Sequence, residues 1–324
     1  MQVASVNSVE STAGAHESYR QLNNSFRQKL VFRLGASAGF FSEYNNMLLA
    51  MLYCLDHRIR FVLYSSAANF AYSRGWEDFF VPFASESRIS LHSRYNKRTE
   101  KEFRAAESRN TRRNSLILKR LTGTAYLTHD LFDVIREEAK SGRRYDIPEL
   151  GINGDVRHAC EVLLALTWRF NPDTSSRVSS MITGVGLPSE YVGIHIRSGE
   201  KFTEATPFGV DSYVRKVEEN SRLQHVYVAT DDYTNIETLR EVRPQWNLYH
   251  ACDTTDRGYD QARYETLSRE TKRKDLLDLL ADVEILSRSS FFVGTFTSNV
   301  GMFVGLRVSR AKSAGLDSPH WFVW

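Results

Sequence analysis

The chain has 324 residues, of which 42% are hydrophobic and 25% are charged, and its formal net charge is +3. This composition is typical of a globular protein with a sizeable core, and the length suggests two domains. The mild charge argues against general nucleic-acid binding, so we expect no nucleic-acid partner. Widely spaced cysteines argue against a disulfide framework and fit a reducing compartment; they are Cys54, Cys160 and Cys252.

The N-terminal residues lack the apolar core of a signal peptide. The longest apolar run, 47–55, is far too short to span a bilayer. We therefore expect a soluble, cytoplasmic protein, and we leave open that a longer parent chain carries a membrane anchor.

After a disordered or helical lead-in over residues 1–28, the first half opens with the pattern of a βαβ unit. Residues 30–34 suit a strand, the small residues of 35–39 suit a loop, and 43–55 has the apolar face of a helix. Small residues let the backbone approach a ligand, and a helix N-terminus favours an anion. The loop is not a Walker phosphate loop, because no Gly-Lys-Ser/Thr follows. A tight turn without a ligand stays an equal alternative.

A second strand is predicted at 61–65, and the aromatic segment 75–83 follows it. The next stretch, 93–120, contains ten Lys or Arg residues. A basic stretch of this kind is most often a solvated helix face or a mobile loop. The sharper alternative is a patch for an acidic acceptor or a polyanion.

The domain boundary is predicted near the middle of the chain. Residues 121–150 look helical and loop-rich, and 156–170 is a strongly amphipathic helix. A polar stretch, 173–180, follows, and glycines and a proline interrupt the chain at 184–188. We therefore expect an N-terminal α/β domain over 1–185, as the probable acceptor side, and a C-terminal domain over 186–324.

The second half alternates between strands and helices. Such alternation predicts a parallel, Rossmann-like sheet. The expected strands are 191–196, 225–229, 247–250 and 290–295, and the expected helices are 209–219, 233–242 and 274–287.

Three of these strands end in polar residues. The first ends in His195 and Arg197, which alternate along the strand and therefore share one side of it. The carboxyl ends of parallel strands gather at one edge of a sheet, where ligands bind in open α/β folds. A bidentate Arg, hydroxyl groups and a helix N-terminus at that edge suit a nucleotide diphosphate. The other two polar ends are Asp231-Asp232 and Thr297-Ser298-Asn299.

The pair Asp231-Asp232 could be mistaken for a metal motif. Adjacent residues of a strand point to opposite faces, so the two carboxylates are poorly placed to hold one ion. A helix N-cap, or a hydrogen bond to a ribose or a loop, is the better interpretation. We therefore expect no metal.

Five segments, in this order, resemble the α-1,6-fucosyltransferases of animal N-glycans and rhizobial nodulation factors. They read H-I-R-S-G-E-K, T-E-A, V-Y-V-A-T-D-D, A-D-V-E-I-L-S and F-V-G-T-F-T-S-N-V. The small-residue loop at 35–39 and the segment 75–82 are also similar to that family. The resemblance implies two Rossmann-like domains in a GT-B-like fold. It also implies inverting, metal-independent transfer of fucose from GDP-fucose to an oligosaccharide or glycoconjugate, with no cofactor.

The same resemblance implies roles for individual residues. Arg197 resembles the essential Arg of the pyrophosphate site, and Glu204, with Lys201 beside it, resembles the base that activates the acceptor. Asp282 resembles the carboxylate that accepts hydrogen bonds from guanine. The alternative for Asp282 is a cap or salt bridge within its own helix. The full set expected to bind the GDP-sugar is His195, Arg197, Asp231, Asp232, Asp282, Thr297, Ser298, Gly39 and Tyr72.

Two positions depart from the family pattern. Ser198 stands where many members have a second Arg, and Met302 stands where the animal enzyme has an Arg. These departures leave two alternatives open: a transferase that uses another GDP-sugar, and a catalytically weakened protein that binds sugar nucleotides or glycans.

Overall fold

The computed structural model describes residues 4–36, 38–106, 109–198 and 208–323. The chain divides into two compact units, Met1–Asn171 (unit 1) and Pro172–Trp324 (unit 2), and we describe each separately. Both are α/β units built on parallel sheets, as predicted.

Unit 1 has a three-stranded parallel sheet in the order β2-β1-β3. Its helix α2 packs on β2, and the aromatic segment after β2 completes the core: the rings of Trp76 and Phe80 stack with centroids 4.2 Å apart. A short antiparallel hairpin, β4-β5, was missed in the helical or loop-rich interpretation of 121–150. The elements are α1 (Ala4–Ser25), β1 (Gln28–Arg33), α2 (Phe40–Asp56), β2 (Ile59–Tyr64), η1 (Gly75–Asp78), α3 (Leu91–Tyr95), α4 (Glu100–Ala105), α5 (Arg109–Thr122), β3 (Tyr126–Leu127), α6 (Thr128–Lys140), β4 (Tyr145–Ile147), η2 (Pro148–Leu150), β5 (Ile152–Gly154) and α7 (Val156–Thr167).

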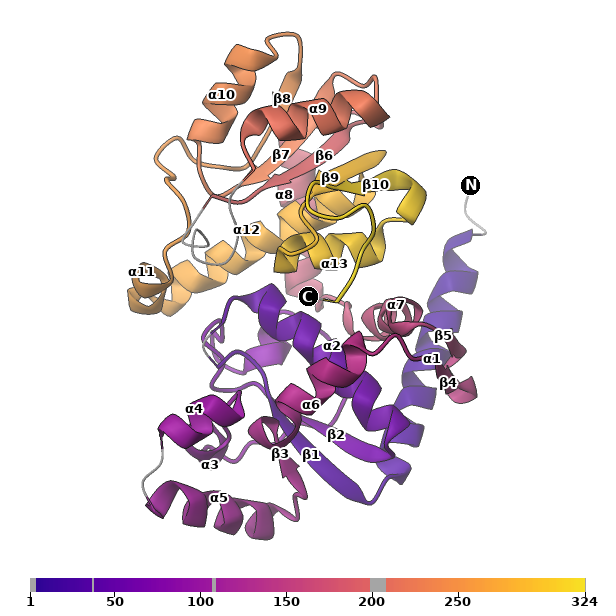
Figure 1. Cartoon of the computed structure of the whole chain (residues 1–324), viewed down its shortest axis with the longest axis vertical. Helices are drawn as coiled ribbons and strands as arrows, with labels where there is room; N and C mark the ends of the chain where they lie inside the picture. Colours follow the sequence, from indigo (N-terminus) through magenta and orange to yellow (C-terminus); the bar gives the residue numbers. More distant parts are fainter. Residues whose placement is uncertain (1–3, 37, 107–108, 199–207, 324) are drawn as a thin grey trace. The chain divides into compact units, whose positions relative to one another are not determined.

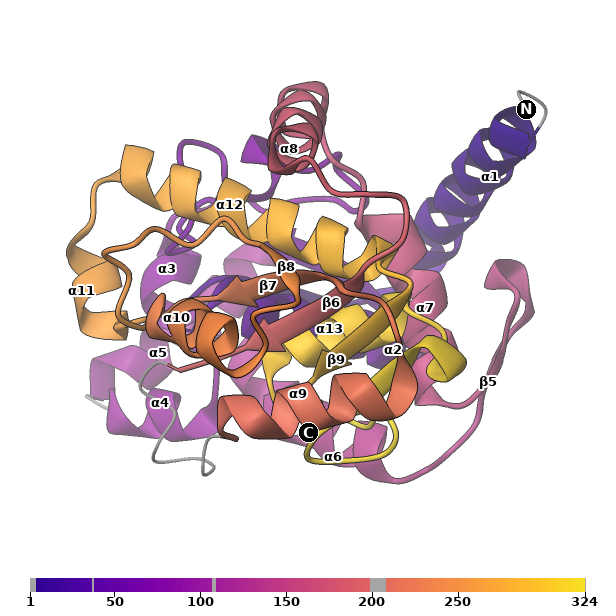
Figure 2. The ribbon, with the colours of Figure 1, turned by 90° about the horizontal axis from the view of Figure 1, so that it is seen from above.

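Unit 2 has a five-stranded parallel sheet in the order β10-β9-β6-β7-β8. Helices α9 and α12 lie on opposite faces of this sheet (Figures 1 and 2). The elements are α8 (Pro172–Val185), β6 (Val192–Ile196), α9 (Val210–Asn220), β7 (His225–Thr230), α10 (Thr234–Val242), β8 (Asn247–Tyr249), α11 (Gln261–Thr266), α12 (Arg269–Arg288), β9 (Phe291–Gly294), α13 (Asn299–Arg307), η4 (Arg310–Lys312) and β10 (Ser313–Gly315).

The core of unit 2 follows from the apolar strands. All five residues of β6 are buried, which is expected of a central parallel strand covered on both faces. Val192, Ile194 and Ile196 pack with Val226 and Val228 of β7, and the buried apolar residues of α9 and α10 close over them.

The polar stretch 173–180 is not irregular, because it forms part of helix α8. Pro172 suits the first turn of a helix, and Thr174 and Val178, four residues apart, are buried on one face. This face packs against α12, so the helix belongs to unit 2. The two units divide between Asn171 and Pro172, before α8. The boundary predicted after residue 185 falls at the C-terminal end of that helix.

Candidate donor-binding site

The order in which strands are added to the unit 2 sheet changes side at β6. From β6 the sheet grows through β7 and β8 on one side, and then through β9 and β10 on the other. In open α/β sheets this switch point leaves a crevice at the carboxyl ends of the strands. The polar ends of β6, β7 and β9 therefore lie at the same edge, as the sequence predicted.

His195 near the end of β6 and Arg197 just after it carry buried nitrogen atoms that have no hydrogen-bond partner among the described residues. His195 is 9% exposed. Its Nδ1 and the Nε of Arg197 form no hydrogen bond with the described residues. Buried polar atoms are nearly always hydrogen-bonded, so this pair marks a place for a ligand with acceptor groups.

The environment of His195 holds its ring neutral at physiological pH. Burial away from water is the main cause that lowers the pKa of His195 to about 4, and the positive charge of Arg197 acts in the same direction. The carboxylate of Asp231 opposes both effects only partly. Arg197 is therefore the cation of this pair, and His195 can offer one donor and one acceptor.

The two carboxylates after β7 hold the surrounding loops. Asp231 accepts hydrogen bonds from the backbone N–H of Ser198 at 2.9 Å and of Tyr259 at 3.0 Å. Asp232 accepts from the backbone N–H and the hydroxyl of Thr234, at 3.0 and 2.7 Å, in the first turn of α10. Asp231 thus makes the loop hydrogen bonds that were weighed for the pair, whereas the N-cap of α10 is Tyr233 and not Asp232. The role of the pair toward a donor stays a prediction.

Ser198, the first departure from the family pattern, connects β6 to α10. Its hydroxyl accepts a 2.7 Å hydrogen bond from Nδ2 of Asn235, and its backbone N–H donates to Asp231. The position is thus part of the frame that fixes the β6 end beside Arg197.

The residues after β9 form the start of α13. Ser298 is the N-cap of this helix, and its hydroxyl accepts from the backbone N–H of Gly301 at 3.4 Å. Thr297 donates from its backbone N–H and its hydroxyl to the carboxylate of Asp317, at 2.7 and 2.5 Å. Asp317, which also accepts from the backbone N–H of Phe296 at 2.8 Å, was not found from the sequence because it follows no motif.

Asp282 on α12 is paired with a buried tyrosine. The hydroxyl of Tyr227 on β7, which is fully buried, donates a short hydrogen bond to Oδ1 of Asp282. Burial raises the pKa of Asp282 to about 7; the Tyr227 hydroxyl opposes this shift and the nearby Asp278 adds to it. The sequence missed Tyr227 as a partner, although its place in a predicted buried strand was visible.

Three basic residues of α12 pair with carboxylates other than Asp282, which bears on the alternative that Asp282 forms a salt bridge within its own helix. Lys274 pairs with Asp278 at 2.9 Å, and Arg288 pairs with Glu284 at 3.1 Å. Arg273 pairs with Asp173 at 2.7 Å. These three cations therefore have other carboxylate partners, and the salt-bridge alternative for Asp282 stays less favoured than the pair with Tyr227.

The predicted residues of unit 1 lie at turns. Gly39 is the N-cap of α2, and a methyl group placed on it would meet nothing within 4 Å. The backbone N–H of Tyr72 donates to the carboxylate of Asp78 at 2.9 Å. Beside the 35–39 loop, the buried carboxylate of Glu43 accepts from the backbone N–H of Gly35 and pairs with Arg98 at 3.2 Å. The predicted catalytic pair Lys201 and Glu204 falls outside the described residues.

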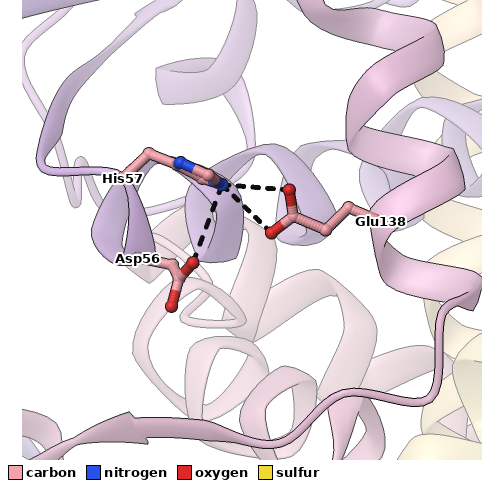
Figure 3. Close-up of side chains that lie close together, drawn as sticks. All are labelled: Asp56, His57 and Glu138. Atoms are coloured by element: carbon pink, nitrogen blue, oxygen red, sulfur yellow. Dashed lines mark hydrogen bonds and ion pairs between the residues drawn. The ribbon is translucent and has the colours of Figure 1, made fainter.

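A second cluster of titratable groups lies in unit 1, where α2 ends against α6 (Figure 3). His57 Nε2 lies 2.9 Å from Oε2 of Glu138 and 3.7 Å from Oδ2 of Asp56. The guanidinium of Arg143 binds both carboxylates, with 2.6 Å to Asp56. A metal ion would have to displace this arginine, so we interpret the cluster as an ion-pair network between the two helices.

Among the described residues, no helix is both long and apolar enough to cross a bilayer.

Comparison with known proteins agrees with this architecture. Residues 156–307 match the family described as alpha-(1,6)-fucosyltransferase N- and catalytic domains. The alpha-(1,6)-fucosyltransferase of Drosophila melanogaster is 28% identical over 142 residues, which cover 41% of this chain and 22% of that protein. The Caenorhabditis elegans protein of the same name is 26% identical over 144 residues, which cover 41% of this chain and 24% of its own length. The chain thus matches about a quarter or less of each curated relative.

Solved structures show the same fold. The fucosyltransferase NodZ from Bradyrhizobium superimposes with a TM-score of 0.53 at 12% identity, over 87% of this chain and 93% of that one. NodZ soaked with GDP-fucose gives a TM-score of 0.52, with the same coverage and identity. The predicted GT-B-like arrangement of an α/β chain is thereby confirmed. Residues 156–307 are thus similar to the α-1,6-fucosyltransferases, in the family match and in both curated relatives.

Proposed function

We propose that this chain transfers L-fucose from GDP-fucose to a hydroxyl group of a glycan. The family match supports the reaction class, and the likeness to NodZ supports a fold that carries it. The observation that carries the proposal is the pair of buried nitrogen atoms of His195 and Arg197 at the switch point of unit 2, which have no partner in the part of the chain that the structure describes.

In this proposal the residues of unit 2 bind GDP in parts. The guanidinium of Arg197 holds the diphosphate, and the N-terminus of α13 at Ser298 adds backbone donors for the phosphate oxygens. Asp282 accepts hydrogen bonds from guanine, and Tyr227 holds its carboxylate in place. His195 gives a further hydrogen bond near the phosphates.

The proposed chemistry is an inverting displacement. The acceptor oxygen forms a bond to the anomeric carbon as the bond from that carbon to the phosphate oxygen breaks. The acceptor proton passes to a carboxylate base, for which we propose Glu204, with Lys201 as its neighbour. GDP leaves with added negative charge, which Arg197 and Ser298 stabilise without a metal. We propose N-acetylglucosamine as the acceptor sugar and its 6-hydroxyl as the nucleophile.

A screen for GDP release tests this function. GDP-fucose and GDP-mannose are each offered with a panel of acceptor glycans, and the anomeric configuration of any product is read by NMR. We expect acceptor-dependent release from GDP-fucose and an α-linked product. Release from GDP-mannose alone would replace fucose by another GDP-sugar.

A second candidate is a binding protein with weakened catalysis. Met302 is buried at 5% exposure, and its carbonyl accepts the indole N–H of Trp321 at 2.9 Å, so this position contributes no cation. GDP-fucose binding without turnover on any acceptor would favour this candidate.

A further inference from the structure

Helix α5 in unit 1 presents an unusual face to solvent. The helix has 14 residues, and most of it lies in the basic segment 93–120; the fucosyltransferase match does not reach it. Its inner side is anchored by Leu118, which is 1% exposed and packs with Val31, Val62 and Leu127 of the sheet. Its outer side carries Leu116, Ile117 and Leu121, exposed by 65%, 42% and 73%.

Large exposed apolar side chains are concentrated in this part of the molecule. Seven occur among the described residues, and three of them belong to α5. Two more are Leu91, the first residue of α3, and Ile89 just before that helix, and α3 packs against α5 (Figure 1). Single exposed apolar residues are normal, but a group of this kind marks an interaction surface.

Arginines are interleaved with these apolar residues. Arg113, Leu116, Ile117 and Arg120 are spaced at i, i+3, i+4 and i+7, so they share one face of the helix. Arg112 is also exposed, and the helix contains no acidic residue. Lys119 does not belong to this face, because it pairs with Asp130 at 2.7 Å. We call Arg113, Leu116, Ile117, Arg120 and Leu121 the α5 face.

The chemistry of the α5 face restricts what can cover it. A soluble polyanion would pair with the arginines and leave the leucines in water. A second copy of the chain would bring two arginine-rich faces together, and like charges in contact oppose association. The surface of an anionic membrane satisfies both features, because phosphate groups bind guanidinium and the acyl boundary accepts leucine.

We propose that the α5 face docks unit 1 on an anionic membrane surface as a peripheral contact. This contact is separate from the donor site, so its test does not depend on fucosyl transfer. The full chain is mixed with vesicles of phosphatidylcholine alone, or with about a third of phosphatidylserine, and sedimented. We expect binding only to the anionic vesicles, and we expect added salt to weaken it.

Paired variants separate the two contributions. Arg113→Gln with Arg120→Gln is expected to weaken vesicle binding about twentyfold, because each surface Arg contributes about fivefold. Leu116→Ala with Leu121→Ala is expected to weaken it about tenfold or more. The charge control is Arg215→Gln with Arg222→Gln, two exposed residues of unit 2, and the apolar control is Val134→Ala, which is 49% exposed on α6. Both controls should bind like the wild type, since neither changes the α5 face.

A fluorescent probe reports the contact directly. Leu121→Trp should be quenched by brominated anionic lipid, whereas Val134→Trp should not. The proposal is overturned if vesicle binding is weakened equally by the Arg113 and Arg120 variant and by the control variant of Arg215 and Arg222. That result would show charge attraction without a defined surface. The proposal is also overturned if anionic vesicles do not bind, or if heparin binds through the arginines while the leucine variant behaves like the wild type. GDP affinity should be unchanged in all of these variants.

Discussion

The residues that we propose for the donor site are polar groups at strand ends. His195 is neutral and Arg197 is charged, and each has a buried nitrogen without a partner among the described residues. Such atoms cost free energy unless a ligand pairs with them, so the folded chain is poised for an acceptor-rich ligand. The strand-end pattern of the sequence predicted the position of both residues at the end of β6, and their role toward a donor stays a prediction.

Replacing Arg197 tests the phosphate role. We expect Arg197→Ala to lose about 2–4 kcal/mol of transition-state stabilisation, which is a loss of about 30- to 1000-fold in kcat/KM. Arg197→Lys should also fail, because a point charge cannot replace a planar fork of donors. The assay is GDP release, with Arg215→Lys as the matched control. Activity of Arg197→Lys near that of the wild type would remove the bidentate role.

The titration of Asp282 gives a pH dependence to guanine binding. Its pKa is raised to about 7 by burial, so the free protein holds a proton there below neutral pH. Guanine donors need the ionised carboxylate. GDP binding must therefore release that proton below the pKa, and affinity should fall up to about tenfold per pH unit there. The affinity should be constant well above the pKa.

Calorimetry with GDP and ADP between about pH 6 and pH 8 measures this effect. Both nucleotides carry the same diphosphate, so the ratio of the two affinities cancels the contribution of phosphate protonation. Asp282→Asn should weaken GDP binding at the upper pH and make the ratio independent of pH. A ratio that stays constant in the wild type would contradict the role of Asp282.

At the scale of the element, η1 lies in the segment 75–82, which resembles the fucosyltransferases in sequence, and its contacts stabilise the fold of unit 1. The carboxylate of Asp78 accepts from the backbone N–H groups of residues 72–75, at 2.8 to 3.0 Å. Burial opposes this charge, but these hydrogen bonds together lower the pKa of Asp78. The turn places Trp76, which is fully buried, against Tyr44 and Phe80.

Gly75 is required in this turn, because its φ is +82° and an added Cβ would lie 2.2 Å from the carbonyl oxygen of Ser65. We expect Gly75→Ala to lower the free energy of unfolding by about 3 kcal/mol or more. Gly142→Ala is the matched control: its φ is +73° and nothing lies within 4 Å, so only about 1 kcal/mol of strain is expected. Urea unfolding measures both. Equal losses would show that the contact with Ser65 does not matter.

At the scale of the whole molecule, alternation of strands and helices was enough to predict two parallel α/β units. Strands β6, β7 and β9 were predicted because they are apolar runs that end in polar residues. Helix α8 was not predicted from the sequence, because its apolar stripe is short. The contacts of Asp282 with Tyr227, and of Thr297 with Asp317, join residues far apart in sequence, and no local pattern encodes them.

The metal requirement can be checked on the intact protein. Asp231 and Asp232 are engaged by backbone and hydroxyl donors, and Arg143 occupies the carboxylates beside His57. We therefore expect transfer to survive an excess of EDTA. Loss of activity on chelation, with recovery on adding manganese or magnesium, would show that the metal-free prediction is wrong.

The most direct test of a GDP-sugar site in unit 2 is the selectivity of the wild-type protein among nucleotides. Competition calorimetry compares GDP, ADP and UDP above neutral pH, where Asp282 is ionised. A carboxylate left unpaired by the wrong base costs about 1–3 kcal/mol, so GDP should bind at least several-fold to about a hundredfold more tightly than the others. Equal affinities for the three nucleotides would contradict the guanine assignment and, with it, GDP-fucose as the donor.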